Sequence, residues 1–204
     1  SPAVVDELRR RRINTSVVAA STARLEFGPT AHNDLVRASP HYYNDSVAES
    51  RRVTILLSDI RGFTAIAETY AATTVMDMLN RYFTVMTRVI VENGGTIDKL
   101  MGDSMMVLFG APNPEDDDVE RAIACAVGMQ QAMSEFNEQN IAMGLPALYI
   151  GVGLNTGEVV AGPVGSQYHS EYTVIGDEVN LASRIEAQTL RGQILISENT
   201  YQLA

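Results

Sequence analysis

Two aspartates stand where strand-like segments of this sequence end, and together they could bind a metal ion. Asp59 follows the apolar, β-prone run at residues 53–58, and Asp103 lies in the two-residue turn between strand patterns at 96–101 and 104–109. If the first strand neighbours this hairpin, the two carboxylates converge and repel each other unless a hard cation bridges them. Mg²⁺ or Mn²⁺ accepts a few carboxylates and keeps positions open for phosphate oxygens. Singly, each aspartate is also typical of a helix cap or a turn, but as a pair they favour a metal site.

The backbone just after Asp59 could hold a phosphate group. A helix is expected over residues 63–70, so the N–H groups of Gly62, Phe63 and Thr64 lie at its N-terminus. Anions bind favourably at such an end. Gly62 would also allow a phosphate to approach the backbone closely.

Two further pairs of residues could recognise a nucleotide. Asn180 and Arg184 are four residues apart in a helix expected over 177–187, so they share one face. An amide and a guanidinium there could hold a ribose oxygen and a phosphate, although an ordinary surface polar pair has the same spacing. Lys99 and Thr173 offer a donor and an acceptor, which match the N1 acceptor and N6 donor of adenine. Taken alone, a strand lysine more often simply faces solvent.

Lys99 is the only lysine among 15 basic residues, and its position excludes two classes of enzyme. A P-loop NTPase needs its lysine in a Gly-Lys-Ser/Thr context, whereas this one stands in Asp98-Lys99-Leu100. A protein kinase needs a lysine on a Val-Ala-Ile-Lys-like strand, and no such segment occurs.

The net charge of −10 is concentrated in one part of the chain. Residues 1–52 hold eight arginines against six acids, whereas residues 53–204 hold six arginines and one lysine against nineteen acids. A surface this acidic repels nucleic acid, so we expect no nucleic-acid partner. A phosphorylated substrate would need divalent cations to bridge the like charges.

Cysteine content and hydropathy predict a cytoplasmic protein. The single cysteine, Cys125, excludes an internal disulfide framework and fits a reducing compartment. No apolar run approaches the roughly 18 residues that a spanning helix needs, and no signal-peptide pattern is present. We therefore expect no membrane insertion in this segment.

The sequence divides into two parts. Residues 1–50 show weak periodicity, with a helical pattern over 3–26 and a polar, turn-rich stretch over 28–50. We predict an N-terminal linker or tether there. Residues 51–204 have sharper patterns and are predicted to form one folded domain.

The order of elements from residue 53 onward is β-α-α-β-β-α-β-β-β-α-β. This order predicts the α+β class, with a ferredoxin-like βαββαβ core in which an antiparallel sheet carries helices on one face. Strands are expected at 53–58, 96–101, 104–109, 149–154, 158–161, 171–175 and 193–197, with a turn at 155–157. Helices are expected at 63–70, 73–92 and 177–187, with a long helix opening at the acidic cluster 115–118.

Four motifs, in order, resemble the catalytic domain of the class III nucleotidyl cyclases. The resemblance covers about residues 51–201, so the second part is expected to be a catalytic domain. That family converts a nucleoside triphosphate into a 3′,5′-cyclic nucleotide and pyrophosphate. The motifs are Ser58-Asp59-Ile60-Arg61-Gly62-Phe63-Thr64, Asp98-Lys99-Leu100-Met101-Gly102-Asp103, Gly151-Val152-Gly153 to Gly157, and Gly176-Asp177-Glu178-Val179-Asn180-Leu181-Ala182-Ser183-Arg184.

The resemblance implies a role for each matching residue. Asp59, Asp103 and the Ile60 carbonyl match the ligands of two Mg²⁺ or Mn²⁺ ions. Asn180 matches the asparagine that orients the ribose. Arg184 matches the arginine that stabilises charge developing on the α-phosphate, an electrostatic role.

Lys99 and Thr173 fall at the two purine-selecting positions of the family. Guanylyl cyclases typically carry Glu at the first, so Lys99 favours ATP. Adenylyl cyclases commonly carry Asp at the second. Thr173 is instead similar to the soluble, bicarbonate-responsive adenylyl cyclases of cyanobacterial type, which makes bicarbonate a candidate activator.

The resemblance also implies an assembly and a context. In this family the metal ligands come from one subunit, and the purine, asparagine and arginine positions come from the other. This chain carries both halves, so we expect a homodimer with two equivalent sites and an inactive monomer. Relatives continue with further β-structure after Tyr201, so the domain over 51–204 is expected to be truncated at its C-terminus.

The sequence thus predicts an adenylyl cyclase that makes cyclic AMP from ATP in intracellular signal transduction. Two alternatives stay open. One is a guanylyl cyclase. The other is a non-catalytic nucleotide-binding or dimerisation module, against which the intact Asp59, Asp103, Asn180 and Arg184 argue.

Overall fold

The computed structural model describes residues 48–166 and 168–204 of the chain. The helix predicted over 3–26 and the linker predicted over 1–50 lie outside this range, apart from the last residues of the linker. The first strand begins at Glu49, within the last residues of the predicted linker. The division of the chain at residue 50 stays a prediction.

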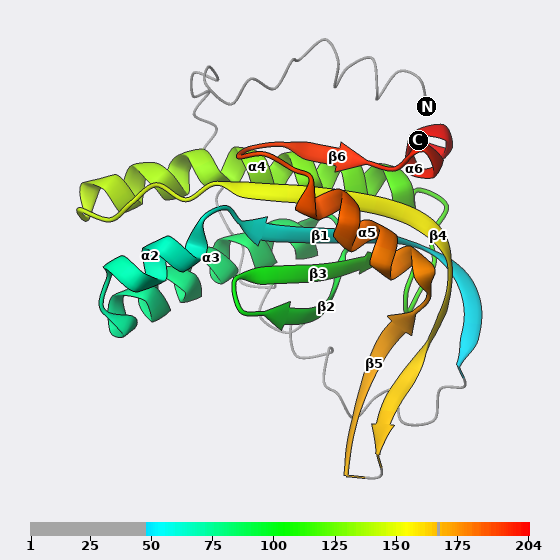
Figure 1. Ribbon diagram of the computed structural model, residues 1–204. Helices are drawn as coiled ribbons and strands as arrows, with labels where there is room; N and C mark the ends of the chain where they lie inside the picture. The colour runs from blue at the N-terminus through cyan, green and yellow to red at the C-terminus, as the bar shows by residue number, and fades with distance from the viewer. Residues whose placement is uncertain (1–47, 167) are drawn as a thin grey trace, which may run out of the picture.

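Strands and helices follow nearly the order expected from the sequence (Figure 1). The elements are β1 (Glu49–Ile60), α2 (Phe63–Thr69), α3 (Ala72–Glu92), β2 (Thr96–Met101), β3 (Ser104–Phe109), α4 (Asp118–Ala142), β4 (Ile150–Ser166), β5 (His169–Ile175), α5 (Asp177–Ala187), β6 (Ile194–Ile196) and α6 (Glu198–Leu203). The predicted α+β class is confirmed. None of the helices in the described ranges is both long enough and apolar enough to cross a membrane.

One sheet organises the domain, with strand order β2-β3-β1-β4-β5. β1 lies between β3 and β4, so the strand that ends in Asp59 neighbours the hairpin that carries Asp103, as expected. All pairings along this order are antiparallel. β6 adds a parallel pairing to β4, so the sheet is mixed rather than purely antiparallel.

Helices cover both faces of the sheet, so the prediction that they lie on one face was wrong. Side chains alternate along a strand, and on β1 Leu56 joins the core formed with Met78 of α3 and Met129 of α4. Its neighbour Ile55 joins a second apolar cluster with Ala182 of α5. In Figure 1, α5 crosses in front of β1 and β4, whereas α3 and α4 lie behind them.

The predicted turn at 155–157 was also wrong, because β4 is one continuous strand of 17 residues. β1 pairs with β4 from Glu49↔Ala161 to Ile60↔Ile150, and this ladder engages the backbone of the turn-like residues. The Asn155 amide donates to the Glu178 carbonyl of α5 over 3.0 Å. These residues, although typical of turns, therefore take part in the contact between β4 and α5.

Gly153 of β4 sets how closely α5 approaches the sheet. A Cβ at this position would lie 2.5 Å from the Glu186 backbone nitrogen and 2.6 Å from its Cα. The obstacle is backbone, so α5 itself would have to move. We expect Gly153→Ala to lower the free energy of unfolding by about 1–3 kcal/mol, measured by thermal and urea unfolding.

A second glycine provides the control for this prediction. At Gly128 in α4 a Cβ would meet only a Val89 methyl, at 3.0 Å, and alanine in a helix recovers about 1 kcal/mol over glycine. We expect Gly128→Ala to be close to neutral. Equal destabilisation by both substitutions would contradict the proposed role of Gly153.

Candidate active site

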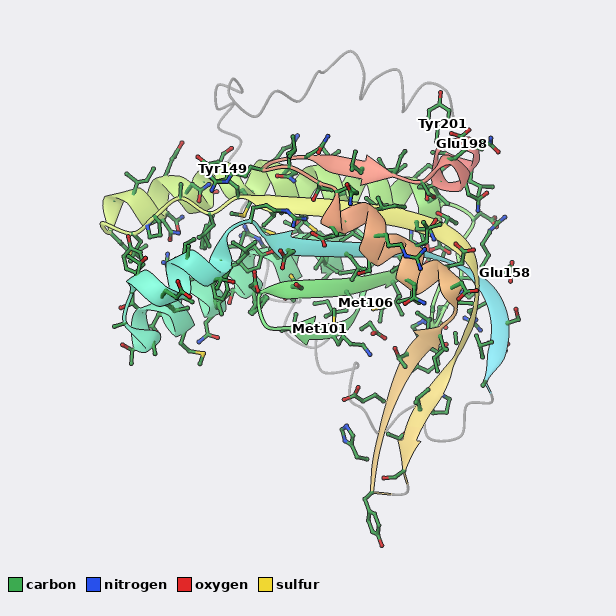
Figure 2. All side chains as sticks on the ribbon, viewed as in Figure 1. Met101, Met106, Tyr149, Glu158, Glu198 and Tyr201 are labelled. Carbon is green, nitrogen blue, oxygen red and sulfur yellow. The ribbon has the colours of Figure 1, made fainter. Side chains whose placement is uncertain are left out.

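The structure brings Asp59 and Asp103 together at one end of the sheet. Asp59 comes just before the end of β1, and Asp103 lies in the turn between β2 and β3, directly before Ser104. The Ser104 hydroxyl donates to Asp59 Oδ1 over 2.6 Å, so the two segments are in contact. Met101, labelled in Figure 2, is the last residue of β2 before this turn.

The two carboxylates repel each other. Burial and then the negative charge of Asp59 raise the pKa of Asp103 above its usual range. The nearby cation, Arg61, is shared between two acids. Its Nη1 makes a long ion pair with Asp59 Oδ2 at 3.5 Å, whereas its Nη2 donates to the Glu186 carbonyl over 2.7 Å and forms an ion pair with the Glu186 carboxylate. A bound divalent cation would remove this repulsion.

The donor set fits Mg²⁺ or Mn²⁺. Within the described residues, no group of three or more His, Cys, Asp or Glu side chains gathers in a way that could hold a metal ion. Two carboxylates suffice for Mg²⁺, which usually keeps several positions for water and substrate phosphate. Asp59, Asp103 and the backbone carbonyl of Ile60 are the groups that would hold it.

The segment after Asp59 presents backbone N–H groups, as the phosphate prediction requires. Gly62 is the N-cap of α2 in a left-handed conformation, with φ of 79°, and no side chain caps the helix. The N–H groups at Phe63 and Thr64 are therefore not taken by a capping side chain. Arg191 lies beside this turn, because its Nη2 would be 3.7 Å from a Cβ on Gly62.

Lys99 and Thr173 are in direct contact, although they lie on opposite edge strands of the sheet. Lys99 Nζ donates to Thr173 Oγ1 over 3.2 Å. β2 and β5 are the ends of the strand order, but β4 and β5 bend away from the rest of the sheet as a long arm (Figure 1). Thr173 lies near the end of β5, where the arm joins the sheet, and is buried there.

Asn180 and Arg184 lie on the exposed side of α5. Ala182 between them is buried against the sheet, so both side chains face away from it. Among the described residues, neither makes a hydrogen bond or ion pair with the carboxylates. The structure thus groups Asp59 with Asp103 and Lys99 with Thr173, and leaves Asn180 and Arg184 exposed on α5 without a bond to the carboxylates.

Sequence reasoning did not single out Ser104 and Glu186, which position groups of the site. Ser104 contacts Asp59 because of the β1–β3 register, in which Ser58 pairs with Met105. Glu186 holds Arg61 across 125 residues of sequence. Neither contact leaves a local pattern, since both depend on how distant elements pack.

One cavity among the described residues lies away from the predicted site residues. A cavity of about 340 Å³ opens between the first half of β1 and the start of α4, lined among others by Arg51, Arg52 and Asp118. It contains none of the predicted site residues.

Comparison with known protein families identifies this arrangement. Residues 46–204 match the family described as the adenylate and guanylate cyclase catalytic domain. The adenylate cyclase of Anabaena cylindrica is 41% identical over 158 residues, which cover 74% of this chain and 30% of that protein. Adenylate cyclase 1 of Rhizobium meliloti is 32% identical over 176 residues, which cover 85% of this chain and 26% of that protein. The chain thus spans less than a third of the length of these relatives.

Solved structures agree on the fold. The guanylyl cyclase Cya2 is 48% identical with a TM-score of 0.76, over 78% of this chain and 81% of that chain. The adenylyl cyclase CyaB from P. aeruginosa is 39% identical with a TM-score of 0.75, over 78% and 82% respectively. The chain belongs to the adenylate and guanylate cyclase family, the class III nucleotidyl cyclases.

Proposed function

We propose that this domain is an adenylyl cyclase, which converts ATP to 3′,5′-cyclic AMP and pyrophosphate in signal transduction. The observation that carries the choice of ATP is the contact of Lys99 with Thr173 at 3.2 Å. This pair offers one donor and one acceptor side by side, which suits the N1 and N6 atoms of adenine. The adenylate cyclases among the relatives support the same choice.

The carboxylate pair would hold the divalent cations of the reaction. Two bound Mg²⁺ or Mn²⁺ ions would supply Lewis acidity that lowers the pKa of the ribose 3′-OH and neutralises phosphate charge. Asp59 and Asp103 provide the negative charge that attracts them, and Ile60 a carbonyl oxygen. The N–H groups of Gly62, Phe63 and Thr64 would hold phosphate oxygens beside them.

The remaining residues would act on the ribose and the α-phosphate. The 3′-oxygen attacks the α-phosphorus, the 3′-OH proton passes to water, and the bond from that phosphorus to the bridging oxygen breaks to release pyrophosphate. Asn180 would orient the ribose so that the 3′-oxygen is in line with the leaving group. Arg184 would stabilise the negative charge that develops on the α-phosphate oxygens.

Two chains would be needed to assemble each site. Asn180 and Arg184 are exposed on α5, and within the described part of the chain neither bonds to Asp59 or Asp103. A two-fold dimer pairs the surfaces of two chains reciprocally, so each interface would produce two equivalent sites. Activation by bicarbonate and a cytoplasmic location stay predictions.

The direct test is an assay of purified protein with ATP and Mn²⁺ at increasing protein concentration. We expect cyclic AMP, with specific activity that rises as dimer forms. No cyclic AMP at micromolar protein would contradict the proposal. ATP binding without turnover would favour the non-catalytic nucleotide-binding module.

A guanylyl cyclase is the second candidate, because Cya2 is 48% identical to this chain. The purine pair separates the two functions. We expect the double substitution Lys99→Glu and Thr173→Cys to shift the ratio of ATP to GTP turnover toward GTP. Because two hydrogen-bonding groups change, the shift should be about tenfold or more. Side-by-side assays with both nucleotides measure this ratio. Loss of ATP turnover with no gain for GTP would show that the purine assignment is incomplete.

A further inference from the structure

A buried carboxylate, Asp98, lies behind the purine-selecting pair. Its side chain is 0% exposed. Oδ2 accepts a hydrogen bond from Thr173 Oγ1 over 3.1 Å and lies 3.2 Å from Lys99 Nζ. Oδ1 is buried and has no hydrogen-bond partner among the described residues. Asp98, Lys99 and Thr173 thus form a closed triangle of polar contacts.

An irregularity in β2 makes this triangle possible. Consecutive residues of a regular strand point to opposite faces, so Asp98 and Lys99 could not both reach Thr173. The pairing of β2 with β3 shifts register between Ile97 and Lys99, which leaves Asp98 as an extra residue on β2. Such bulges redirect side chains and are frequent beside active sites. Here the bulge turns two neighbouring side chains toward the same hydroxyl.

The triangle fixes which way the Thr173 hydroxyl faces. A hydroxyl has one proton to donate and two lone pairs to accept with. The proton goes to Asp98, and one lone pair accepts from Lys99. Only a lone pair is left for a ligand, so Thr173 can accept but not donate. Lys99 keeps one of its three protons for a ligand.

Adenine matches this polarity. Its N6 amine donates and its N1 accepts, whereas guanine offers an acceptor at O6 and a donor at N1. Without Asp98 the Thr173 hydroxyl could rotate and donate to a guanine O6, so the discrimination would fall.

We propose that Asp98 is a positioning residue that selects adenine by holding the Thr173 hydroxyl as an acceptor and Lys99 beside it. This inference rests on the proposed function and adds Asp98 to the residues that determine its nucleotide specificity. The chemistry of the carboxyl is consistent with it. Burial raises the pKa of Asp98, and the hydrogen bond from Thr173 and the charge of Lys99 oppose that rise. The two purine-selecting residues are therefore the groups that counteract the effect of burial on this carboxyl.

The test uses two nucleotides that differ only in the N6 amine, ATP and purine riboside 5′-triphosphate. For the unmodified chain we expect kcat/KM to favour ATP by about tenfold or more, the value of a hydrogen bond to a group that is otherwise left unpaired. Asp98→Asn keeps the shape but can donate as well as accept. We expect it to reduce this preference about tenfold and to raise the use of GTP relative to ATP.

Two further variants show whether Asp98 acts through Thr173. Thr173→Val removes the hydroxyl with little change in shape and should abolish the preference for the amine. Asp98→Asn added to Thr173→Val should then change the preference by less than about twofold, since the effects of substitutions at residues that act together are not additive. The exposed Asp77 of α3 provides the control, because Asp77→Asn removes the same charge away from the site.

The outcomes separate this inference from the proposed function. An unmodified chain that makes no cyclic AMP overturns the proposed function. An active chain whose Asp98→Asn variant keeps the full preference for the amine, or loses turnover of both nucleotides equally, overturns the inference. If Asp98→Asn does not fold, as judged by circular dichroism, Asp98→Ser carries the same comparison with a smaller neutral side chain.

Discussion

Asp59→Asn is expected to lower cyclic AMP production at least about a thousandfold, which corresponds to about 4 kcal/mol of transition-state stabilisation. The amide keeps the size of the side chain and can still accept the 2.6 Å hydrogen bond from Ser104. It removes the negative charge that Asp59 would offer to divalent cations, and the loss of one metal ligand removes most of the charge stabilisation in such a site. Initial rates with Mn²⁺ and ATP measure the effect.

The same variant should not lose stability. The charge of Asp59 raises the pKa of Asp103, so removing it relieves repulsion in the metal-free protein. We expect the melting temperature without metal to be equal or higher, and the increase on adding Mn²⁺, which binding to the folded state produces, to be lost. Asp77→Asn, on an exposed part of α3, should retain both activity and the response to Mn²⁺. Undiminished turnover in Asp59→Asn would contradict the metal assignment.

Arg184→Ala is expected to lower kcat about a hundredfold to a thousandfold with a much smaller change in KM. Removal of one preorganised group that stabilises developing charge has effects of this size, and a loss confined to kcat indicates an interaction made in the transition state. Arg184 is exposed on α5, and alanine is the better helix former. The fold should therefore be unaffected, and steady-state kinetics with ATP report the loss directly.

Arg184→Lys separates charge from geometry. Lysine keeps the positive charge but not the planar fork of donors, so we expect partial recovery of kcat. Arg88→Ala, exposed on α3, removes a positive charge outside the residues assigned to the site and should leave kcat within about twofold. A rise in KM alone for Arg184→Ala would instead indicate a role in binding the ground state.

Local patterns were sufficient for those parts of the site that depend on neighbouring residues. The hairpin around Gly102-Asp103 and helix α5 have the predicted bounds, because turn residues and helical spacing act over a few positions. Adjacency of Asp59 and Asp103 followed from the order of elements, since β1 pairs with β3.

Other features could not be predicted because they depend on distant contacts. The turn-like residues Asn155 and Gly157 lie inside β4, since Asn155 bonds to Glu178 of α5 and a Cβ at Gly157 would strike the same glutamate. The contact of Lys99 with Thr173 depends on the bend of the β4–β5 arm, and the role of Asp98 on a register shift in β2. A six-residue helix at the end of the described chain, α6, was not expected either.

The claim that each site combines groups from two chains can be tested by mixing two inactive variants. Asp59→Asn and Arg184→Ala are co-expressed, so that heterodimers form with one intact site each. Random pairing makes half of the dimers heterodimers, and we predict about a quarter of the unmodified activity. The control pair Asp59→Asn with Asp103→Asn damages the same half of the site and should restore nothing. If the co-expressed Asp59→Asn and Arg184→Ala show no more activity than the two variants assayed separately, the claim of a two-chain site is wrong.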